Sequence, residues 1–354
     1  MDERLNKDRV GKIISIIIPC YNSEEFLDDC FISIQKQTLG MDKLEVIFIN
    51  DASTDDTLNK LLGYETNFPE SIIIIDSAVN TQQGGARNLG LHYATGTYIM
   101  FVDSDDWIKP EMCEALYQIA QEYDADIIAY PFVHYYSETE QETEKSLRYG
   151  FLAVENVQTK RQLLILGDYM DFGSQNKFYK HSLIKEVEAK FVEHAAYEEA
   201  SFAYPLIVAA RKVYWMEEGM YYYRRTRASV TSSYVSQPGK LYDHPKVQLV
   251  LLDKLLKDKK AVNAFYNEIE YHFLHSYYME TLYFAGLHSW YFGIDYFEEM
   301  QKTVLERCPN WEQNPYLKQK EFCNVAEVLK SVRKKFNQQE LADYCKRVVE
   351  ILSN

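Results

Sequence analysis

The chain has 354 residues, of which 47% are hydrophobic and 26% charged, a composition typical of a globular protein that folds in water. Its formal net charge of −15 excludes nucleic-acid binding as the main function, because surfaces that bind nucleic acids are basic. The six cysteines are scattered without a Cys-x-x-Cys pair, and the apolar run 13–18 is too short for a signal core or a membrane span. We therefore expect reduced thiols, neither a zinc site nor a disulfide framework, and a cytoplasmic protein without a transmembrane segment.

Strand and helix patterns alternate through residues 13–132. We expect Pro19 to stop the first strand and Ser23 to cap the first helix, and Ser53 opens the second helix with capping-box spacing. The expected strands are 13–18, 44–49, 72–75, 98–102 and 126–132, and the expected helices are 24–37, 53–63, 84–94 and 110–123. This alternation predicts an α/β fold with a mostly parallel sheet flanked by helices.

The pattern loosens after residue 133 and then becomes helical. The polar run 137–145 predicts an exposed loop, and the acid pair Glu198–Glu199 precedes a predicted helix. The remaining expectations are helices at 161–166 and after 179, and a strand at 212–216. A Gln-Pro-Gly turn at 237–239 is followed by almost continuous helical patterns. We therefore expect two domains, an α/β domain over residues 1–235 and a helical domain over 236–354.

Three acids follow the predicted strand 98–102 within four positions: Asp103, Asp105 and Asp106. Carboxylates crowded at a strand end repel one another, and a divalent cation removes that repulsion. Oxygen ligands suit Mg²⁺ or Mn²⁺, and Mg²⁺ is usually held by one or two carboxylates plus substrate phosphates. The sequence thus predicts a metal–diphosphate site at the sheet edge where open α/β sheets bind ligands. The alternative is a solvated acidic turn.

Other residues at the predicted strand ends suit a nucleotide. Asp51 could accept a hydrogen bond from a base, and Tyr21 offers a ring for stacking, although Asp51 could also fix a loop and Tyr21 could belong to the core edge. The run Gly84–Arg87 could bring backbone N–H groups and a guanidinium to a phosphate. It lacks the spacing of a Rossmann dinucleotide site and the ending of a P-loop.

Two further clusters could complete an active site. Glu198 or Glu199 could act as a general base, and the alternative is the solvated first turn of a helix, where acids are favoured. The arginines 224, 225 and 227 could clamp a departing diphosphate, and the alternative is a basic rim near the domain junction.

Taken in order, these motifs resemble the bacterial family 2 glycosyltransferases, which have the GT-A nucleotide-diphospho-sugar transferase fold. The motifs are IIIPCYN at 16–22, NDASTDDT at 50–57, GGARNLG at 84–90, ATGTYIMFVDSDD at 94–106, NKFY at 176–179, YEE at 197–199 and YRRTRAS at 223–229, and Asn80 belongs to the same set. The resemblance covers residues 12 to 232, and it leaves the C-terminal third without a recognised motif.

The resemblance implies a role for each matching residue. Asp103 would lie near the ribose and the metal, Asp105 would bind the Mn²⁺ or Mg²⁺ ion that bridges the diphosphate, and Glu199 would be the catalytic base. Because members commonly carry Glu-Asp where this chain has Glu198–Glu199, Glu198 could share or take that role. The other donor-binding residues would be Pro19, Tyr21, Asn22, Asp51, Arg87, Ser104, Arg224 and Arg227.

The implied function is an inverting, metal-dependent transfer of one sugar from a UDP-sugar to a hydroxyl of a glycan or lipid-linked glycan acceptor in bacterial surface polysaccharide or glycoconjugate synthesis. The alternative is a non-catalytic sugar-nucleotide or glycan-binding subunit that supports a partner transferase. A glycosidase with paired carboxylates would leave the nucleotide-pocket residues without a use.

The C-terminal region has a broad apolar face formed by Phe265, Ile269, Phe273, Leu274, Tyr277, Tyr278, Leu282 and Phe284. This face could be the core of the helical domain, a homodimer interface or an aromatic wall for the acceptor. The basic run 330–335 could contact anionic lipid at the inner face of the cell membrane or an acceptor pyrophosphate, and the alternative is a solvated helix face.

Overall fold

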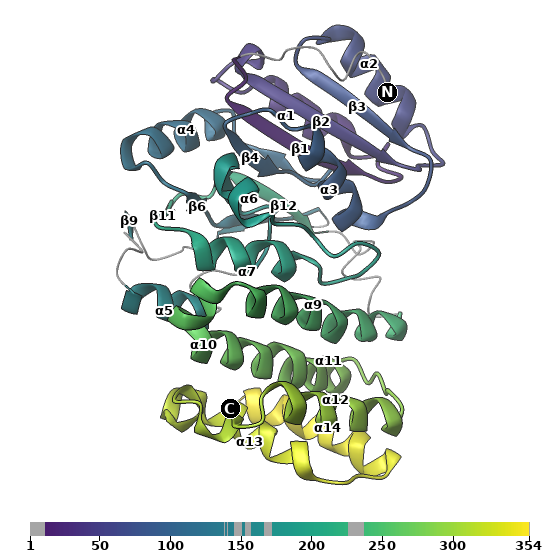
Figure 1. The fold of residues 1–354 in the computed structure, drawn as a ribbon. Helices are drawn as coiled ribbons and strands as arrows, with labels where there is room; N and C mark the ends of the chain where they lie inside the picture. The colour runs from purple at the N-terminus through teal and green to yellow at the C-terminus, as the bar shows by residue number, and fades with distance from the viewer. Residues whose placement is uncertain are drawn as a thin grey trace. The chain divides into compact units, whose positions relative to one another are not determined.

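The structure is a computed structural model that describes residues 11–137, 139, 141–144, 151–152, 157–165, 172–225 and 237–353. The chain divides into two compact units, each described below by itself (Figure 1). The first unit consists of Met1–Leu163, Gly167–His194 and Glu198–Arg227, and the second of Leu164–Leu166, Ala195–Tyr197 and Ala228–Asn354. The predicted domain boundary at 235/236 lies outside the described residues.

The first unit contains a mixed sheet whose described strands run in the order β3-β2-β1-β4-β10-β6-β11-β9. The strands are β1 (Ile14–Cys20), β2 (Leu44–Asp51), β3 (Ile72–Ser77), β4 (Tyr98–Phe101), β6 (Ile127–Ala129), β9 (Phe151–Leu152), β10 (Lys177–Lys180) and β11 (Val213–Trp215). β1 to β4 are parallel, and β10 is inserted antiparallel between β4 and β6. The predicted α/β class with a mostly parallel sheet is confirmed.

A second sheet, with the order β5-β12-β7-β8, was not predicted. Its strands are β5 (Trp107–Ile108), β7 (Phe132–Tyr136), β8 (Gln141–Glu144) and β12 (Tyr221–Arg225). The single strand expected at 126–132 is therefore wrong, because β6 and β7 belong to different sheets and the chain leaves the first at Pro131, which has no N–H to donate. The loop expected at 137–145 is also wrong where β8 pairs with β7.

The sequence predicted that the first strand stops at Pro19, and this prediction is wrong. β1 continues to Cys20, and Pro19 pairs in register with Ile49 of β2. Alternate residues of β1 face β4, and Ile17 accepts a hydrogen bond from the N–H of Val102 on that side. Pro19 faces the same side, beyond the end of β4, so its missing N–H breaks no ladder bond.

Seven described helices lie wholly or largely in the first unit, and three of them begin later than predicted. They are α1 (Leu27–Gln35), α2 (Thr57–Asn67), α3 (Gln82–Tyr93), α4 (Met112–Tyr123), α5 (Val157–Ile165), α6 (His181–Val187) and α7 (Glu199–Ala209). The Ser23 side chain does not cap α1, because its hydroxyl is bonded to the Tyr21 N–H and to Ser104. In α2 the side-chain acceptor for the first N–H is Asp55, which binds Thr57, and not Ser53.

The second unit is helical, as predicted. Its longer elements are α9 (Asp243–Lys257), α10 (Lys259–Phe273), a π-helical turn (Leu274–Glu280), α11 (Thr281–Leu287), α12 (Ile294–Arg307), α13 (Cys323–Leu329) and α14 (Gln338–Ser353). Most of the predicted apolar face is buried here, and Phe284 is half-buried, so the face belongs to the core of this unit. In the basic run, Lys330 pairs with Glu327 and Arg333 with Glu312, as expected for a solvated face. None of the described helices combines the length and hydropathy that crossing a bilayer requires.

Helix α3 lies close against the sheet because it carries glycine where it crosses β1 and β2 (Figure 1). A Cβ atom on Gly90 would lie 2.4 Å from Cγ2 of Ile17 and 3.0 Å from Cδ1 of Ile49. A Cβ atom on Gly84 would lie 2.6 Å from the carbonyl oxygen of Val192 and 2.9 Å from Cγ of Glu198. The same helix carries Arg87, so these glycines set the position of that side chain.

We predict opposite effects for alanine at two helical glycines. Gly90→Ala should lower the free energy of unfolding by about 1–3 kcal/mol, because the new methyl group overpacks the contact with β1. Gly63→Ala in α2 is the matched control, since nothing lies within 4 Å of its Cβ position, and it should gain about 0.5–1 kcal/mol from lower backbone entropy in the unfolded chain. Urea unfolding of both variants measures the difference, and equal effects would refute the close approach of α3.

Candidate active site

The sheet brings the predicted strand-end residues to one edge. β1, β2 and β4 are mutually parallel, and at their carboxyl ends lie Tyr21, Asp51 and Asp103. Tyr21 is 53% exposed, whereas Asp51 is buried. In α/β sheets this edge is where ligands bind. The structure therefore places these three residues together as the sequence predicted.

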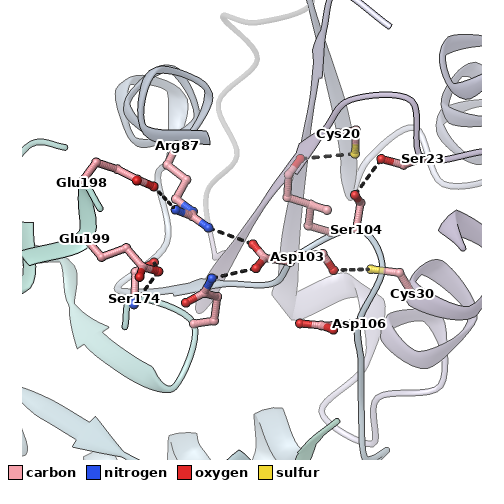
Figure 2. Close-up of polar contacts among 12 residues, drawn as sticks. Cys20, Ser23, Cys30, Arg87, Asp103, Ser104, Asp106, Ser174, Glu198 and Glu199 are labelled. Atoms are coloured by element: carbon pink, nitrogen blue, oxygen red, sulfur yellow. Dashed lines mark hydrogen bonds and ion pairs between the residues drawn. The ribbon is translucent and has the colours of Figure 1, made fainter. Parts of the chain in front are cut away.

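Arg87 is the centre of the site and is fully buried (Figure 2). Its Nη1 donates to Oε1 of Glu198 at 2.8 Å and its Nη2 to Oδ1 of Asp103 at 2.9 Å. Burial disfavours the charged guanidinium, but the two carboxylates outweigh burial and raise the pKa of Arg87. Arg87 thus links Asp103, at the end of β4, to Glu198 of the acid pair. Sequence reasoning missed this link because Arg87 and Glu198 are 111 positions apart in the chain.

Asp103 is held on every side by hydrogen bonds. Its Oδ2 accepts from Nε2 of Gln175 at 2.6 Å, and its backbone N–H donates to the hydroxyl of Tyr221 at 3.0 Å. Together with Arg87, these partners fix both the side chain and the backbone of Asp103. Sequence reasoning did not single out Gln175 or Tyr221, and only the sheet pairing places them here.

Asp106 stabilises the turn after β4. It is buried, its Oδ2 accepts from the Tyr221 hydroxyl at 2.7 Å, and its Oδ1 accepts from the backbone N–H of Arg224 at 2.8 Å. Burial, and then the neighbouring Asp105, raise the pKa of the Asp106 carboxyl. The third acid of the motif is therefore engaged inside the protein and ties the turn to β12.

Asp105 is the acid that remains available for a cation. No other side chain in the described ranges forms a hydrogen bond or ion pair with its carboxylate. Burial, and then Asp103, raise its pKa to about 6, although its own backbone N–H and Arg224 oppose the shift. No group of three or more His, Cys, Asp or Glu side chains in the described ranges is arranged to hold a metal ion. Mg²⁺ is commonly held by one or two carboxylates together with substrate phosphates, so Asp105 fits such an ion.

Arg224 is used within the protein rather than left open for a phosphate. Its Nε donates to the carbonyl oxygen of Asp105 at 2.7 Å, and its Nη2 pairs with Asp29 at 2.8 Å. Its guanidinium also lies over the rings of Trp107 at 4.6 Å and Phe26 at 4.9 Å. Arg224 therefore fixes the backbone of the acidic turn. Arg227 lies outside the described residues.

The end of the site near Tyr21 is also organised by side chains. Oδ1 of Asp51 accepts from the N–H and the hydroxyl of Thr81, each at 2.8 Å, while no described residue bonds its Oδ2. Asn22 has a left-handed φ of 48°, and its Oδ1 accepts from the N–H of Thr54 at 2.8 Å. Ser104 is buried and bonds the Ser23 hydroxyl at 2.7 Å. These contacts leave one Asp51 oxygen and the Tyr21 ring free for a ligand.

The two acids of the pair point in different directions. Figure 2 shows Glu198 directed at Arg87 and Glu199 directed at Ser174. Glu199 begins α7 and is half-buried, and its Oε1 accepts from the Ser174 hydroxyl at 3.3 Å. Glu198 is buried, and burial raises its pKa although Arg87 opposes the shift. Glu198 thus forms part of the Arg87 bridge, and Glu199 is directed to a different part of the site.

Comparisons with known proteins place these features in a family. Residues 15–187 match the model of the family described as glycosyl transferase family 2. Poly(ribitol-phosphate) beta-glucosyltransferase of Bacillus spizizenii is 40% identical over 115 residues, which are 32% of this chain and 18% of that protein. The putative glycosyltransferase EpsH of Bacillus subtilis is 29% identical over 232 residues, 62% of this chain and 63% of that protein. This chain thus spans less than two thirds of the length of either relative.

A solved structure shows the same fold. TarS 1–349 of Staphylococcus aureus in complex with UDP-GlcNAc superposes with a TM-score of 0.66 at 19% identity, over 96% of this chain and 91% of that chain. Its likeness confirms the GT-A fold with a C-terminal helical region.

We predict that removing the Arg87 charge lowers the stability of the protein. Arg87→Met leaves the buried Glu198 carboxylate and the half-buried Asp103 carboxylate without their cation and should lower the free energy of unfolding by roughly 3–5 kcal/mol. Adding Glu198→Gln should restore part of that loss, because one buried charge disappears with its partner. Arg211→Met is the control, since the Arg211 side chain is 76% exposed, and it should stay within about 0.5 kcal/mol of wild type in urea unfolding. A loss below about 1 kcal/mol for Arg87→Met would contradict the buried bridge.

Proposed function

We propose that this chain, whose residues 15–187 belong to glycosyl transferase family 2, transfers one sugar from a UDP-sugar to a hydroxyl of a glycan acceptor. The observation that carries the proposal is the buried Arg87 bridge, because it ties a strand-end carboxylate to an acid pair in one site. A relative that acts on poly(ribitol-phosphate) and a structural neighbour that binds UDP-GlcNAc support a bacterial surface polysaccharide or glycoconjugate as the product.

The donor nucleotide would bind at the exposed ring of Tyr21. A base can stack on that ring, and Oδ2 of Asp51 can accept a hydrogen bond from an N–H group of uracil. Pro19 lies in β1 two residues before Tyr21. The Asn22 side chain accepts from the backbone N–H of Thr54, and the Ser104 hydroxyl bonds the Ser23 hydroxyl. This arrangement supports UDP as the nucleotide, because uracil presents the N–H donor that a carboxylate oxygen accepts.

Asp105, with Asp103 beside it, would hold a Mn²⁺ or Mg²⁺ ion together with the diphosphate. When bound, the ion supplies positive charge that stabilises the departing diphosphate. The raised pKa of Asp105 supports this role, since a carboxylate that is buried beside another carboxylate is one that a cation would stabilise. Asp103 contributes mainly through its fixed position between Arg87 and Gln175.

Glu199 would act as the general base and Glu198 as the anchor that positions it. Glu198 is committed to Arg87, whereas Oε1 of Glu199 lies 3.3 Å from the Ser174 hydroxyl and is directed away from Arg87. A proton taken by Glu199 from the acceptor hydroxyl frees that oxygen to attack the anomeric carbon in line with the leaving diphosphate. In-line attack inverts the configuration at that carbon.

We extend the proposal to a cytoplasmic enzyme that meets lipid-linked acceptors at the inner face of the membrane.

The first experiment is calorimetric titration of the full chain with UDP and a panel of UDP-sugars, with Mn²⁺ and with EDTA. We expect UDP binding that requires Mn²⁺ and is lost in Asp105→Ala, because that carboxylate would hold the ion. Asp56→Ala on the surface at the start of α2 is the control and should bind normally. Wild-type protein that binds no UDP with or without metal would refute the nucleotide assignment.

The second experiment compares the two acids by transfer rate. Glu199→Gln should bind UDP like wild type and transfer at least about 10²-fold more slowly, because it removes the proton acceptor and keeps the shape. Glu198→Gln should have the smaller effect on rate and the larger effect on stability, because it weakens the bridge to Arg87. A larger rate loss in Glu198→Gln would transfer the base role to Glu198. Metal-dependent UDP binding without turnover on any acceptor would favour a non-catalytic binding subunit.

A further inference from the structure

The residues directly before the acid pair belong to the helical unit. Ala195–Tyr197 are part of the second unit, and the first unit resumes at Glu198. A trans peptide bond fixes consecutive Cα atoms about 3.8 Å apart, so whatever fixes Tyr197 also fixes where Glu198 begins. The helical unit thus contains the residue that is bonded directly to Glu198.

Residues of the helical unit contact this short segment through its ring and its backbone. The Tyr197 ring stacks on Phe284 of α11, with centroids 5.5 Å apart and planes 20° apart, and meets the edge of His244 of α9 at 5.2 Å. The N–H of Ala196 donates to Oδ2 of Asp243 at 3.0 Å. Ala195 and Ala196 are buried. These contacts fix the Tyr197 ring and the backbone just before it.

The histidine under the ring is itself fixed. His244 is buried, and its Nδ1 lies 2.9 Å from Oγ1 of Thr281. The Thr281 hydroxyl donates its proton to the carbonyl oxygen of Tyr277, so it can only accept from His244. Nδ1 of His244 therefore carries the proton, and α9 and α11 are joined beneath Tyr197. We call Asp243, His244 and Phe284 the Tyr197 seat.

The backbone of Tyr197 has a conformation that the chain would not adopt without such a seat. Its φ is +63°, in the left-handed region that residues with a Cβ atom rarely occupy. Strained conformations of this kind persist only where the surroundings determine them. The strain immediately before Glu198 is thus balanced by packing within the helical unit.

We propose that Tyr197 is a positioning residue for the acid pair, held by the Tyr197 seat so that Glu199 keeps the orientation that proton transfer needs. The inference rests on the base role of Glu199 proposed above. It gives the C-terminal helices a part in the reaction that is separate from any binding of the acceptor.

The test compares Tyr197→Ala with Tyr197→Phe in the full chain. Tyr197→Ala should lower kcat at least about tenfold, because small displacements of a catalytic group are costly, and should leave Kd for UDP with Mn²⁺ within about twofold. Tyr197→Phe keeps both ring contacts and should keep kcat within about twofold. Circular dichroism and thermal melting verify that each variant is folded.

A second pair of variants tests the seat from the other side. Phe284→Ala should reproduce the kcat loss of Tyr197→Ala, whereas Leu287→Ala, 49% exposed on the same helix, should leave kcat unchanged. Because Tyr197 and Phe284 form one contact, the double variant Tyr197→Ala/Phe284→Ala should lose much less than the product of the two single losses.

Each outcome is decisive. A folded Tyr197→Ala with wild-type kcat overturns the inference. An equal loss of kcat in Tyr197→Phe overturns it too, and so does a kcat loss in Tyr197→Ala that is matched by an equal loss of UDP affinity. Multiplicative losses in the double variant would overturn the seat as the cause. Wild-type protein that binds no UDP refutes the proposed function and the inference with it, whereas a normal wild type with an active Tyr197→Ala refutes the inference alone.

Discussion

A guanidinium without water must be surrounded by negative charge, and the first unit is organised to meet that requirement at Arg87. Asp103 comes from the end of β4 and Glu198 from the residue before α7, and both carboxylates pair with the arginine. Glycines 84 and 90 let α3 approach closely enough for the arginine to reach both. The geometry of the site is thus set by one ion-pair bridge and by the two glycines that let α3 pack closely.

A second set of contacts fixes the acidic turn that the bridge begins. Asp106 and Tyr221 tie the turn to β12, and Arg224 holds the carbonyl of Asp105. The small second sheet therefore has a function beyond filling space, since β12 presents the Tyr221 hydroxyl and the Arg224 side chain. With its neighbours occupied in this way, Asp105 is the acid whose charge is left for an exogenous partner.

Sequence reasoning succeeded where local pattern decides and failed where tertiary pairing decides. Continuous apolar runs predicted β1 to β4, because strands of a parallel sheet are buried on both faces. Apolar residues at helical spacing predicted the helices between them. Sequence reasoning ended the first strand at Pro19 because the sequence does not show that β4 ends before Pro19 and so needs no N–H from that residue. The prediction that Arg224 contacts a diphosphate stays a prediction, and the structure adds the contacts with Trp107, Phe26 and Asp29, which the sequence could not show. The link between Arg87 and Glu198 spans 111 positions and leaves no local signal.

The Arg87 bridge also restricts how such a chain can diverge. Replacing Arg87 leaves the carboxylates of Asp103 and Glu198 without their cation, whereas replacing either acid leaves the guanidinium paired with the other. Loss of the arginine is therefore the costliest single step. We expect descendants of this chain to lose one of the two acids before they lose the arginine.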